Sequence, residues 1–458
     1  MKTTFTFLLL LIALTMSAQT PAERQPDGGG GHVIEPGPCL TPDDYARIET
    51  QLAADLEQLR ATGQLPAVND RSVVNFAWPL QPTAACTFNN YYGIANYVDQ
   101  NTTAGIQDYD CGTRTYNGHN GLDISSWPFA WYLMENNLIE VIAAAEGTII
   151  SKADGFADDH CSCVGSWNAV YVQHADGSVA WYGHMKKGTV TSKAIGETVN
   201  QGEFLGVVAS SGCSTAPHLH FEVYKALPYQ RSNLIEAFQS SCNALNNQTW
   251  WDVQQEYRVP TLNAIATHSV PPVFGCTSAE EAPSFANTFA PGATAHFGTY
   301  YRDQLQNQTT TFRLLKPDGS VWKTWNHTSP STYSFSWWYF SWTLPVVNAV
   351  GTWKYEVTYN GQTFLHEFTV ATASAVESAA TERQFVLSPN PTSGQISLSG
   401  PVERIENIRV FDGQGRMIQR ISGASAQLPI DLSARPAGVY FLEISYDSRI
   451  ERARIVRE

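Results

Sequence analysis

The chain has 458 residues, of which 15% are charged and 12% are aromatic, and its formal net charge is −14. This length predicts about three domains, and the aromatic content, including 13 Trp, favours folded β-rich domains over disorder. The acidic balance excludes a basic nucleic-acid-binding surface and disfavours long-range attraction to anionic polymers. We therefore expect recognition by a shaped cleft or an aromatic surface.

Residues 1–18 have the layout of a secretory signal peptide. Lys2 precedes an apolar stretch over residues 5–14, and small residues follow at Ser17 and Ala18. The stretch is short for a bilayer and no second apolar segment follows it, so we expect export and no stable membrane span. In an oxidising compartment the eight cysteines favour disulfides, whose pairing the sequence does not give. A metal site at His160, Cys161 and Cys163 is disfavoured because no partner cysteine pair lies at zinc-finger spacing.

Residues 19–71 are expected to form an N-terminal linker and a helix. The Pro/Gly-rich stretch over residues 20–38, TPAERQPDGGGGHVIEPGP, is expected to hold no regular element. A helix is predicted from an N-cap at Thr41 to about Thr62, with Leu52, Leu56 and Leu59 at helical spacing. This helix could belong to a prosegment or could be a packing helix of the mature protein.

Residues 72–246 carry short β runs separated by glycine, which predicts an antiparallel β domain. The runs are VIAAAEGTII, NAVYVQH, SVAWYGH, GEFLGVVASSG and HLHFEVY. In the last run, alternation places Leu219, Phe221 and Val223 on one face of a strand and both His218 and His220 on the other. One face would be a core and the other a site.

Residues 270–371 alternate aromatic and polar residues, and Asn360-Gly361 is a hairpin signal, so we expect a β-sandwich module. Its tryptophans at positions 337, 338, 342 and 353 could form a stacking surface, although such alternating aromatics are more often core. Residues 372–383 are predicted to be a linker.

Residues 384–458 again show strand and turn patterning. The stretches SPNPTSG from Ser388, IRVFD from Ile408 and AGVYF from Ala437, with the basic tail, resemble the C-terminal sorting domain of proteins exported by type IX secretion. The resemblance implies the type IX secretion machinery as a partner, removal of this domain on export, and a secreted or cell-surface location. The alternative is a generic small β-sandwich.

The segment NGHNGLDI places His119 and Asp123 four residues apart across Gly121. A glycine lets the backbone bend, so both side chains could converge on one ion. Zinc enzymes use three protein ligands and leave a fourth position for water. His119, Asp123 and one histidine of the later pair would supply that set, although each residue alone has an ordinary structural explanation.

Three motifs, NGHNGLDI, the Tyr-Gly-His that ends at His184, and PHLHFE from Pro217, occur in the order seen in lysostaphin-type zinc metallopeptidases, a peptidoglycan endopeptidase family that the chain resembles. The resemblance implies one Zn²⁺ bound by His119, Asp123 and His220. It makes His184 and His218 the catalytic residues, one the general base and the other the group that steadies the oxyanion, without assigning the two roles. The expected fold is mainly β, an antiparallel β-sheet peptidase domain followed by two small β-sandwich domains.

The resemblance also implies a function, that of a zinc endopeptidase, which the signal peptide and the sorting domain make a secreted one and which we expect to be a monomer. It would use metal-activated water on peptide bonds in peptidoglycan cross-bridges or Gly-rich proteins. The alternative is a non-catalytic cell-wall-binding or amidase-activating protein, which the presence of all five site residues disfavours. Ala216 departs from the glycine more usual in the family, and the stretches 87–116 and 127–138 are expected to line or cover the cleft.

Overall fold

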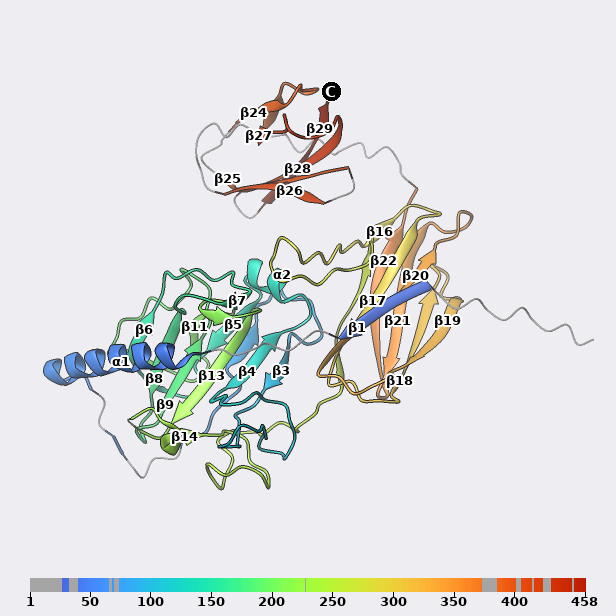
Figure 1. Ribbon diagram of the computed structural model, residues 1–458. Helices are drawn as coiled ribbons and strands as arrows, with labels where there is room; N and C mark the ends of the chain where they lie inside the picture. The colour runs from blue at the N-terminus through green and yellow to red at the C-terminus, as the bar shows by residue number, and fades with distance from the viewer. Residues whose placement is uncertain are drawn as a thin grey trace, which may run out of the picture. The chain divides into compact units, whose positions relative to one another are not determined.

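The computed structural model describes residues 27–32, 40–65, 68–69, 74–226, 228–372, 385–400, 405–413, 416–422, 430–446 and 449–458 (Figure 1). They group into two compact units, one ending at Val370 and the other starting at Ala371. Strands dominate and almost all described pairings are antiparallel, which confirms the mainly β expectation. The predicted signal peptide and nearly all of the predicted linker lie outside the described residues.

Helix α1 (Pro42–Thr62) begins and ends where the sequence predicts. The Thr41 side chain accepts from the Asp44 backbone N–H while Asp44 accepts from the Thr41 backbone, a reciprocal cap, and Gly63 ends the helix in the left-handed conformation. Leu52, Leu56 and Leu59 are buried against a sheet. The helix therefore shares a hydrophobic core with the domain that follows it. Of the helices in the described ranges, none is both long and apolar enough to cross a membrane.

The central sheet of this domain has the strand order β10-β6-β8-β9-β13-β4-β3, with β14 beside β13. Its strands are β3 (Tyr92–Asn96), β4 (Leu122–Ser126), β6 (Gly147–Ala153), β8 (Ala169–Gln173), β9 (Val179–Gly183), β10 (Thr198–Val199), β13 (His218–Tyr224) and β14 (Leu234–Ile235). On one face Leu219, Phe221 and Val223 enter the largest core. On the other face Trp181 and Tyr224 share a core with α1.

Smaller elements surround this sheet, and together with it they confirm the β runs expected between residues 72 and 246. They are β2 (Leu80–Pro82), β5 (Ile139–Ile142) and β11 (Phe204–Val207) in one sheet, β7 (Ser162–Cys163) paired with β12 (Cys213–Ser214), and the helices α2 (Ala130–Glu135) and η1 (Arg231–Asn233).

Residues 261–370 form two packed sheets, with the orders β1-β20-β17-β15 and β16-β22-β21-β18-β19. The strands are β15 (Thr261–His268), β16 (Thr288–Phe289), β17 (Thr294–Arg302), β18 (Thr309–Leu315), β19 (Val321–Thr328), β20 (Phe335–Thr343), β21 (Gly351–Tyr359) and β22 (Gln362–Val370). Asn360 and Gly361 have positive φ between β21 and β22, as the predicted hairpin requires. Trp353 is fully buried between the sheets, and Trp338 and Trp342 pack against the same core. The four tryptophans therefore do not form one stacking surface.

The expectation that residues 20–38 hold no regular element is wrong for one segment. Strand β1 (Asp27–His32, sequence DGGGGH) pairs antiparallel with β20 at the edge of the sandwich (Figure 1). Local composition disfavours a strand here, but the exposed backbone groups of a distant edge strand supply the hydrogen bonds that glycine can use.

The sandwich packs directly against the central-sheet domain. The indole N–H of Trp127 donates to the Tyr301 carbonyl at 2.9 Å, and Arg114 pairs with Asp303 at 2.9 Å with both side chains buried. The ring of Phe129 stacks on Phe274 at 4.8 Å. Trp127 and Phe129 belong to the stretch 127–138, which was expected to line or cover the cleft. In the structure both residues contact the sandwich at this junction.

Three disulfides join Cys111 to Cys242, Cys161 to Cys276 and Cys163 to Cys213. Because Cys161 and Cys163 are both disulfide-bonded, the alternative metal site at these residues is excluded. Among the described cysteines, Cys86 is free, and Cys39 lies outside the described residues.

The second unit contains two antiparallel sheets, β23-β24-β27 and β26-β25-β28-β29. The strands are β23 (Val386–Ser388), β24 (Gln395–Ser399), β25 (Ile405–Phe411), β26 (Met417–Ser422), β27 (Ile430–Asp431), β28 (Gly438–Tyr446) and β29 (Arg449–Arg457). Ile396, Ile408 and Leu442 are fully buried in its core, so the unit has a hydrophobic interior of its own.

Candidate metal centre

Strand pairing brings the histidines of β13 next to the carboxylate of β4. His220 lies opposite Asp123 of β4 and opposite Gly183 of β9, and His218 lies opposite Ser125. His119 precedes β4 in a short loop. Side chains of His119, Asp123, His184, His218 and His220 are all buried. The structure therefore gathers all five sequence-predicted site residues.

Three donor atoms meet at one point. Nε2 of His119 lies 3.2 Å from Oδ1 of Asp123 and 3.4 Å from Nδ1 of His220, and the last two atoms are 2.7 Å apart. Ligands at about 2.0–2.1 Å from a tetrahedral ion lie about 3.3 Å from one another. These residues could therefore hold a metal ion, and two nitrogens with one oxygen make a donor set that suits zinc.

Neighbouring groups fix the orientation of each of these donors. Nδ1 of His119 lies 2.8 Å from the Tyr97 carbonyl, so it carries the proton and the lone pair of Nε2 can face an ion. Nε2 of His220 lies 2.7 Å from Oε1 of Glu222 in the same way. Asn96 donates from Nδ2 to Oδ2 of Asp123 at 2.9 Å. Such partners orient metal ligands in other proteins.

The carboxyl of Asp123 is ionised at neutral pH. Although burial alone would raise its pKa, the imidazoles of His119 and His218 lower the pKa well below its usual value. A metal ligand must be deprotonated, so this residue meets the requirement without a change of state.

His184 and His218 adjoin the three donors. Their ring centroids lie 4.5 Å apart, and Nε2 of His218 is 3.6 Å from Oδ1 of Asp123. Nδ1 of His184 lies 2.6 Å from the Ser211 carbonyl, and Nδ1 of His218 lies 2.8 Å from the Ala216 carbonyl. Each ring therefore has its proton on Nδ1, and Nε2 can accept another. His184 adopts a positive φ of 62° where β9 ends, a conformation uncommon for a non-glycine residue.

His184, His218 and His220 also bring their donor atoms within 4.8 Å of one another, as do His119, Asp123 and His220. The two groups share His220. Only the second contains a carboxylate, and its donors carry the ordered set of partners described above. We therefore take it as the candidate metal centre.

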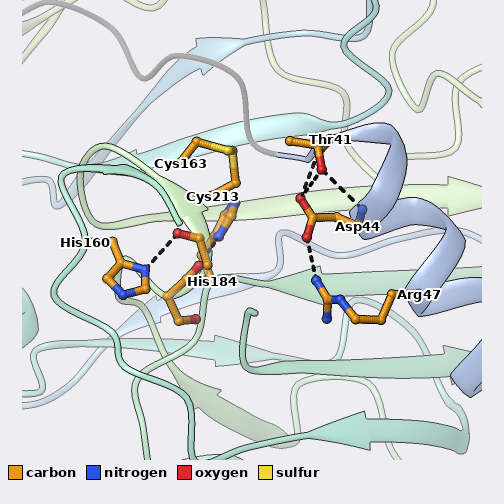
Figure 2. Close-up of a disulfide and its surroundings, with 9 residues drawn as sticks. Thr41, Asp44, Arg47, His160, Cys163, His184 and Cys213 are labelled. Carbon is orange, nitrogen blue, oxygen red and sulfur yellow. Dashed lines mark hydrogen bonds and ion pairs between the residues drawn. A yellow bond between two sulfur atoms is a disulfide. The ribbon is translucent and has the colours of Figure 1, made fainter. Parts of the chain in front are cut away.

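Aromatic side chains wall this centre. The Tyr116 ring lies 4.4 Å from that of His119, and the Trp167 ring lies 5.1 Å from that of His184. Tyr116 belongs to the stretch 87–116 and fulfils the expectation that this stretch lines the site. Figure 2 shows His184 near the Cys163–Cys213 disulfide, and it also draws the Thr41 and Asp44 cap at the start of α1.

Helix α1 reaches the centre through one side chain. The Tyr45 hydroxyl donates to Oε1 of Glu222, and Nδ2 of Asn120 donates to the same hydroxyl at 3.2 Å. Gly121 lies against the His220 ring, because a Cβ at this position would come within 2.6 Å of Cε1 and Nε2. The absence of a side chain at Gly121 therefore leaves space for the His220 ring.

The sequence-based prediction of the site missed Glu222, Asn96 and Tyr45. Glu222 could have been found, because alternation along the β13 strand puts it on the same face as His218 and His220. Nothing local marks Asn96 or Tyr45, which reach the site only through the tertiary fold.

Comparisons with known proteins agree with the motifs. Residues 118–233 match the model of peptidase family M23, and residues 387–458 match that of the secretion system C-terminal sorting domain. The chain therefore contains a lysostaphin-type peptidase domain of family M23 and a C-terminal sorting domain, which points to secretion or the cell surface.

Curated relatives align over the peptidase domain. The chain is 40% identical over 86 residues to the cell division protein DipM of Caulobacter vibrioides, covering 18% of this chain and 13% of DipM. It is 41% identical over 81 residues to the DD-carboxypeptidase/endopeptidase Mpg of Neisseria meningitidis, covering 18% of each. A putative M23 peptidase from Pseudomonas aeruginosa matches with 23% identity and a TM-score of 0.19, over 40% of this chain and 58% of that one. The chain thus spans less than a fifth of either curated relative.

Proposed function

We propose that the chain is a secreted zinc-dependent endopeptidase that hydrolyses peptide bonds in peptidoglycan cross-bridges or in Gly-rich proteins. The observation that carries the proposal is the meeting of His119, Asp123 and His220 around one point, with two further histidines beside it. The name of one relative, a DD-carboxypeptidase/endopeptidase, supports the same class of reaction.

Nε2 of His119, Oδ1 of Asp123 and Nδ1 of His220 would hold the ion. Bound zinc lowers the pKa of a coordinated water toward about 7 and polarises a carbonyl oxygen. The imidazoles of His119 and His218 lower the pKa of Asp123 and keep its carboxylate ionised, and the Glu222 carboxylate behind His220 orients that ring. The chain therefore supplies a rigid three-donor site with one side open to the two other histidines.

His184 and His218 would handle the proton. The ring that acts as the base already donates Nδ1–H to a backbone carbonyl, so its Nε2 can accept a proton from the attacking water and afterwards donate it to the leaving amine. Such general acid–base catalysis typically contributes about 10²–10⁴-fold. The other histidine would steady the developing negative charge once its Nε2 carries a proton as well.

The walls of the centre favour substrates with small side chains. Tyr116 stands over His119, and Trp167 packs against His184 and His220. Because Trp167 is buried in the core behind the histidines, a peptide would approach past the half-buried Tyr116 ring, where glycine residues would meet less steric hindrance. This favours glycine-containing cross-bridges and Gly-rich proteins as the substrate class.

Hydrolysis with and without a chelator tests the proposal. The purified protein should release new amines from peptidoglycan or Gly-rich peptides, and this release should stop when the metal is removed. His220→Ala should lose metal and activity together, whereas His184→Ala and His218→Ala should keep the metal and lose turnover. His366→Ala, a sandwich residue, is the matched control. If chelator-sensitive release is absent from both substrates, the enzyme assignment is wrong.

The rival function is non-catalytic binding to the cell wall or activation of an amidase. The same His220→Ala variant separates the two, because a binder would keep its function without the ligand.

The sorting domain supports export by the type IX secretion machinery, and we propose that it is removed on export and that the released enzyme is a monomer carrying one Zn²⁺.

A further inference from the structure

The edge of the sandwich carries a strand made almost entirely of glycine. β1 pairs with β20 through six positions, from Asp27 opposite Ser341 to His32 opposite Ser336. The four residues between are Gly28, Gly29, Gly30 and Gly31. A strand interior is an unfavourable place for glycine, since each one loses more conformational freedom than any other residue on ordering. Four in a row therefore need a reason.

The reason is space at the β20 edge. A Cβ on Gly28 would lie 2.3 Å from the Tyr339 carbonyl oxygen, and one on Gly30 would lie 2.4 Å from the Trp337 carbonyl oxygen. Both obstacles are backbone atoms, which cannot move without breaking the sheet. A Cβ on Gly31 would meet nothing within 4 Å. In the backbone conformation that β1 adopts on this edge, side chains are therefore excluded at two defined, alternating positions.

Aromatic rings close over the strand from both faces of the sheet. The Tyr339 ring fills the place of a Gly29 side chain, with Cε1 at 2.8 Å from the hypothetical Cβ. The Trp338 ring does the same at Gly30, with Cε3 at 2.4 Å. Trp337 stacks on Tyr339 at 5.9 Å, and Trp338 packs on His327 at 4.3 Å, so the rings are held in place.

The chain's own strand is a weak occupant of this edge. With no side chain on four of its six residues, β1 gains mainly backbone hydrogen bonds and ring contacts, and it pays the entropy of ordering glycine. Its advantage is that it belongs to the same molecule and so has a high effective concentration. Another glycine-rich strand would make the same contacts.

We infer that the β20 edge is a docking site for extended glycine-rich peptides, and that residues 28–31 occupy it as an internal mimic of such a ligand. Binding is by strand addition, in which main-chain hydrogen bonds give affinity and the exclusion of side chains gives specificity. The link to substrate rests on the proposed function, because the ligand class is the same as that of the proposed substrate. The site would hold a Gly-rich chain for the peptidase domain of the same unit.

The inference is tested by measuring how the labelled peptide Asp-Gly-Gly-Gly-Gly-His binds to the full chain. Fluorescence anisotropy reports the binding, and excess EDTA is present throughout. Replacing Gly28 and Gly30 together by valine should expel β1 and tighten peptide binding by about 10–100-fold relative to the native chain. Gly31→Val, which meets open space, is the matched control and should bind the peptide as the native chain does. A peptide with valine at its second and fourth positions should bind the double variant at least about tenfold more weakly.

Equal binding by the double variant and the native chain would overturn the inference, as would equal binding of the two peptides. Dimers of the double variant that bind no peptide would also overturn it, since a second copy would then be the occupant. If the double variant does not fold, the native chain is titrated with each peptide at millimolar concentration. The glycine peptide should change the tryptophan fluorescence of the native chain saturably, and the valine peptide should not. The absence of a saturable change with the glycine peptide would overturn the proposal.

The same measurement separates this inference from the proposed function. Because EDTA is present, peptide binding does not require hydrolysis. Binding without any metal-dependent cleavage would leave the docking site intact and remove the enzyme assignment. Cleavage without glycine-selective binding would do the reverse.

Discussion

Oε1 of Glu222 lies 2.7 Å from Nε2 of His220. The same oxygen accepts the hydroxyl of Tyr45, and Oε2 accepts that of Tyr224 at 2.7 Å. One buried carboxylate therefore connects a histidine of the candidate metal centre with the N-terminal helix and with its own strand. Because Nε2 of His220 is engaged by Glu222, Nδ1 is the ring atom that would face an ion at the candidate centre, and it lies 2.7 Å from Oδ1 of Asp123.

Replacing Glu222 should weaken metal binding without removing a ligand. In Glu222→Leu the His220 ring loses the acceptor that fixes its tautomer, and we expect metal affinity to fall by about 10–100-fold. Glu222→Gln keeps an acceptor oxygen and should fall less. Competition with a chromophoric chelator measures both affinities. If the leucine and glutamine variants both bind metal as the native chain does, Glu222 does not position His220.

A methyl group at Gly121 should displace the His220 ring. The Cβ of Gly121→Ala would lie 2.6 Å from two atoms of that ring and 3.0 Å from Cγ of Glu222. We expect weaker metal binding and lower turnover, with a circular dichroism spectrum like that of the native chain. Gly31→Ala, at a position with open space, is the control and should retain both properties. Unchanged metal affinity in Gly121→Ala would show that the His220 ring can shift without weakening metal binding.

The parts of the fold that local chemistry determines could be predicted from the sequence. The cap at Thr41, the hairpin at Asn360-Gly361 and the two faces of β13 each depend on a few adjacent residues. Spacing and ligand chemistry suggested His119, Asp123 and one histidine of the later pair, but the full set of five residues was predicted because three separated motifs resembled one family. Alternation along a strand explains why His218 and His220 lie on the same face, but alternation alone does not show that they bind a metal.

What the sequence could not give depends on distant partners. The glycines of β1 become a strand because β20 offers an open edge, which no window around residue 28 contains. Gly121 was expected to bend the chain, whereas the structure shows that it leaves room for a ring from β13. Asn96 reaches Asp123 only after β3 pairs with β4. In each case the partner lies outside the local pattern.

The stability of the first unit should depend on pH through Glu281. Burial raises the pKa of this carboxyl from 4.5 to about 8, and its Oε1 accepts the Tyr132 backbone N–H at 2.8 Å. Between pH 4.5 and 8 the native state keeps a proton that the unfolded chain has lost. The stabilisation from this group is thus complete below pH 4.5 and is lost as the pH rises to about 8, at up to about 1.4 kcal/mol per pH unit.

Glu281→Gln keeps the acceptor and removes the titration. The thermal midpoint of the variant should therefore rise relative to that of the native chain as the pH increases from 5 to 8. Glu236, whose pKa burial also raises to about 8, is present in both proteins and cancels in the comparison. Differential scanning calorimetry at several pH values measures the difference. Parallel curves for the two proteins would show that Glu281 does not titrate in this range.

The contribution of Leu56 to stability distinguishes a packing helix from a loosely held prosegment for α1. Leu56 is 2% exposed and packs in the core that α1 shares with the sheet. If the helix is part of the folded domain, Leu56→Ala should lower the free energy of unfolding by about 2–5 kcal/mol, through lost burial and the cavity that remains. Glu57→Ala, at the exposed neighbour, should change it by less than about 0.5 kcal/mol. Denaturant titration followed by tryptophan fluorescence measures both. Equal stability of the two variants would mean that the domain does not depend on the helix, and the prosegment interpretation would then stand.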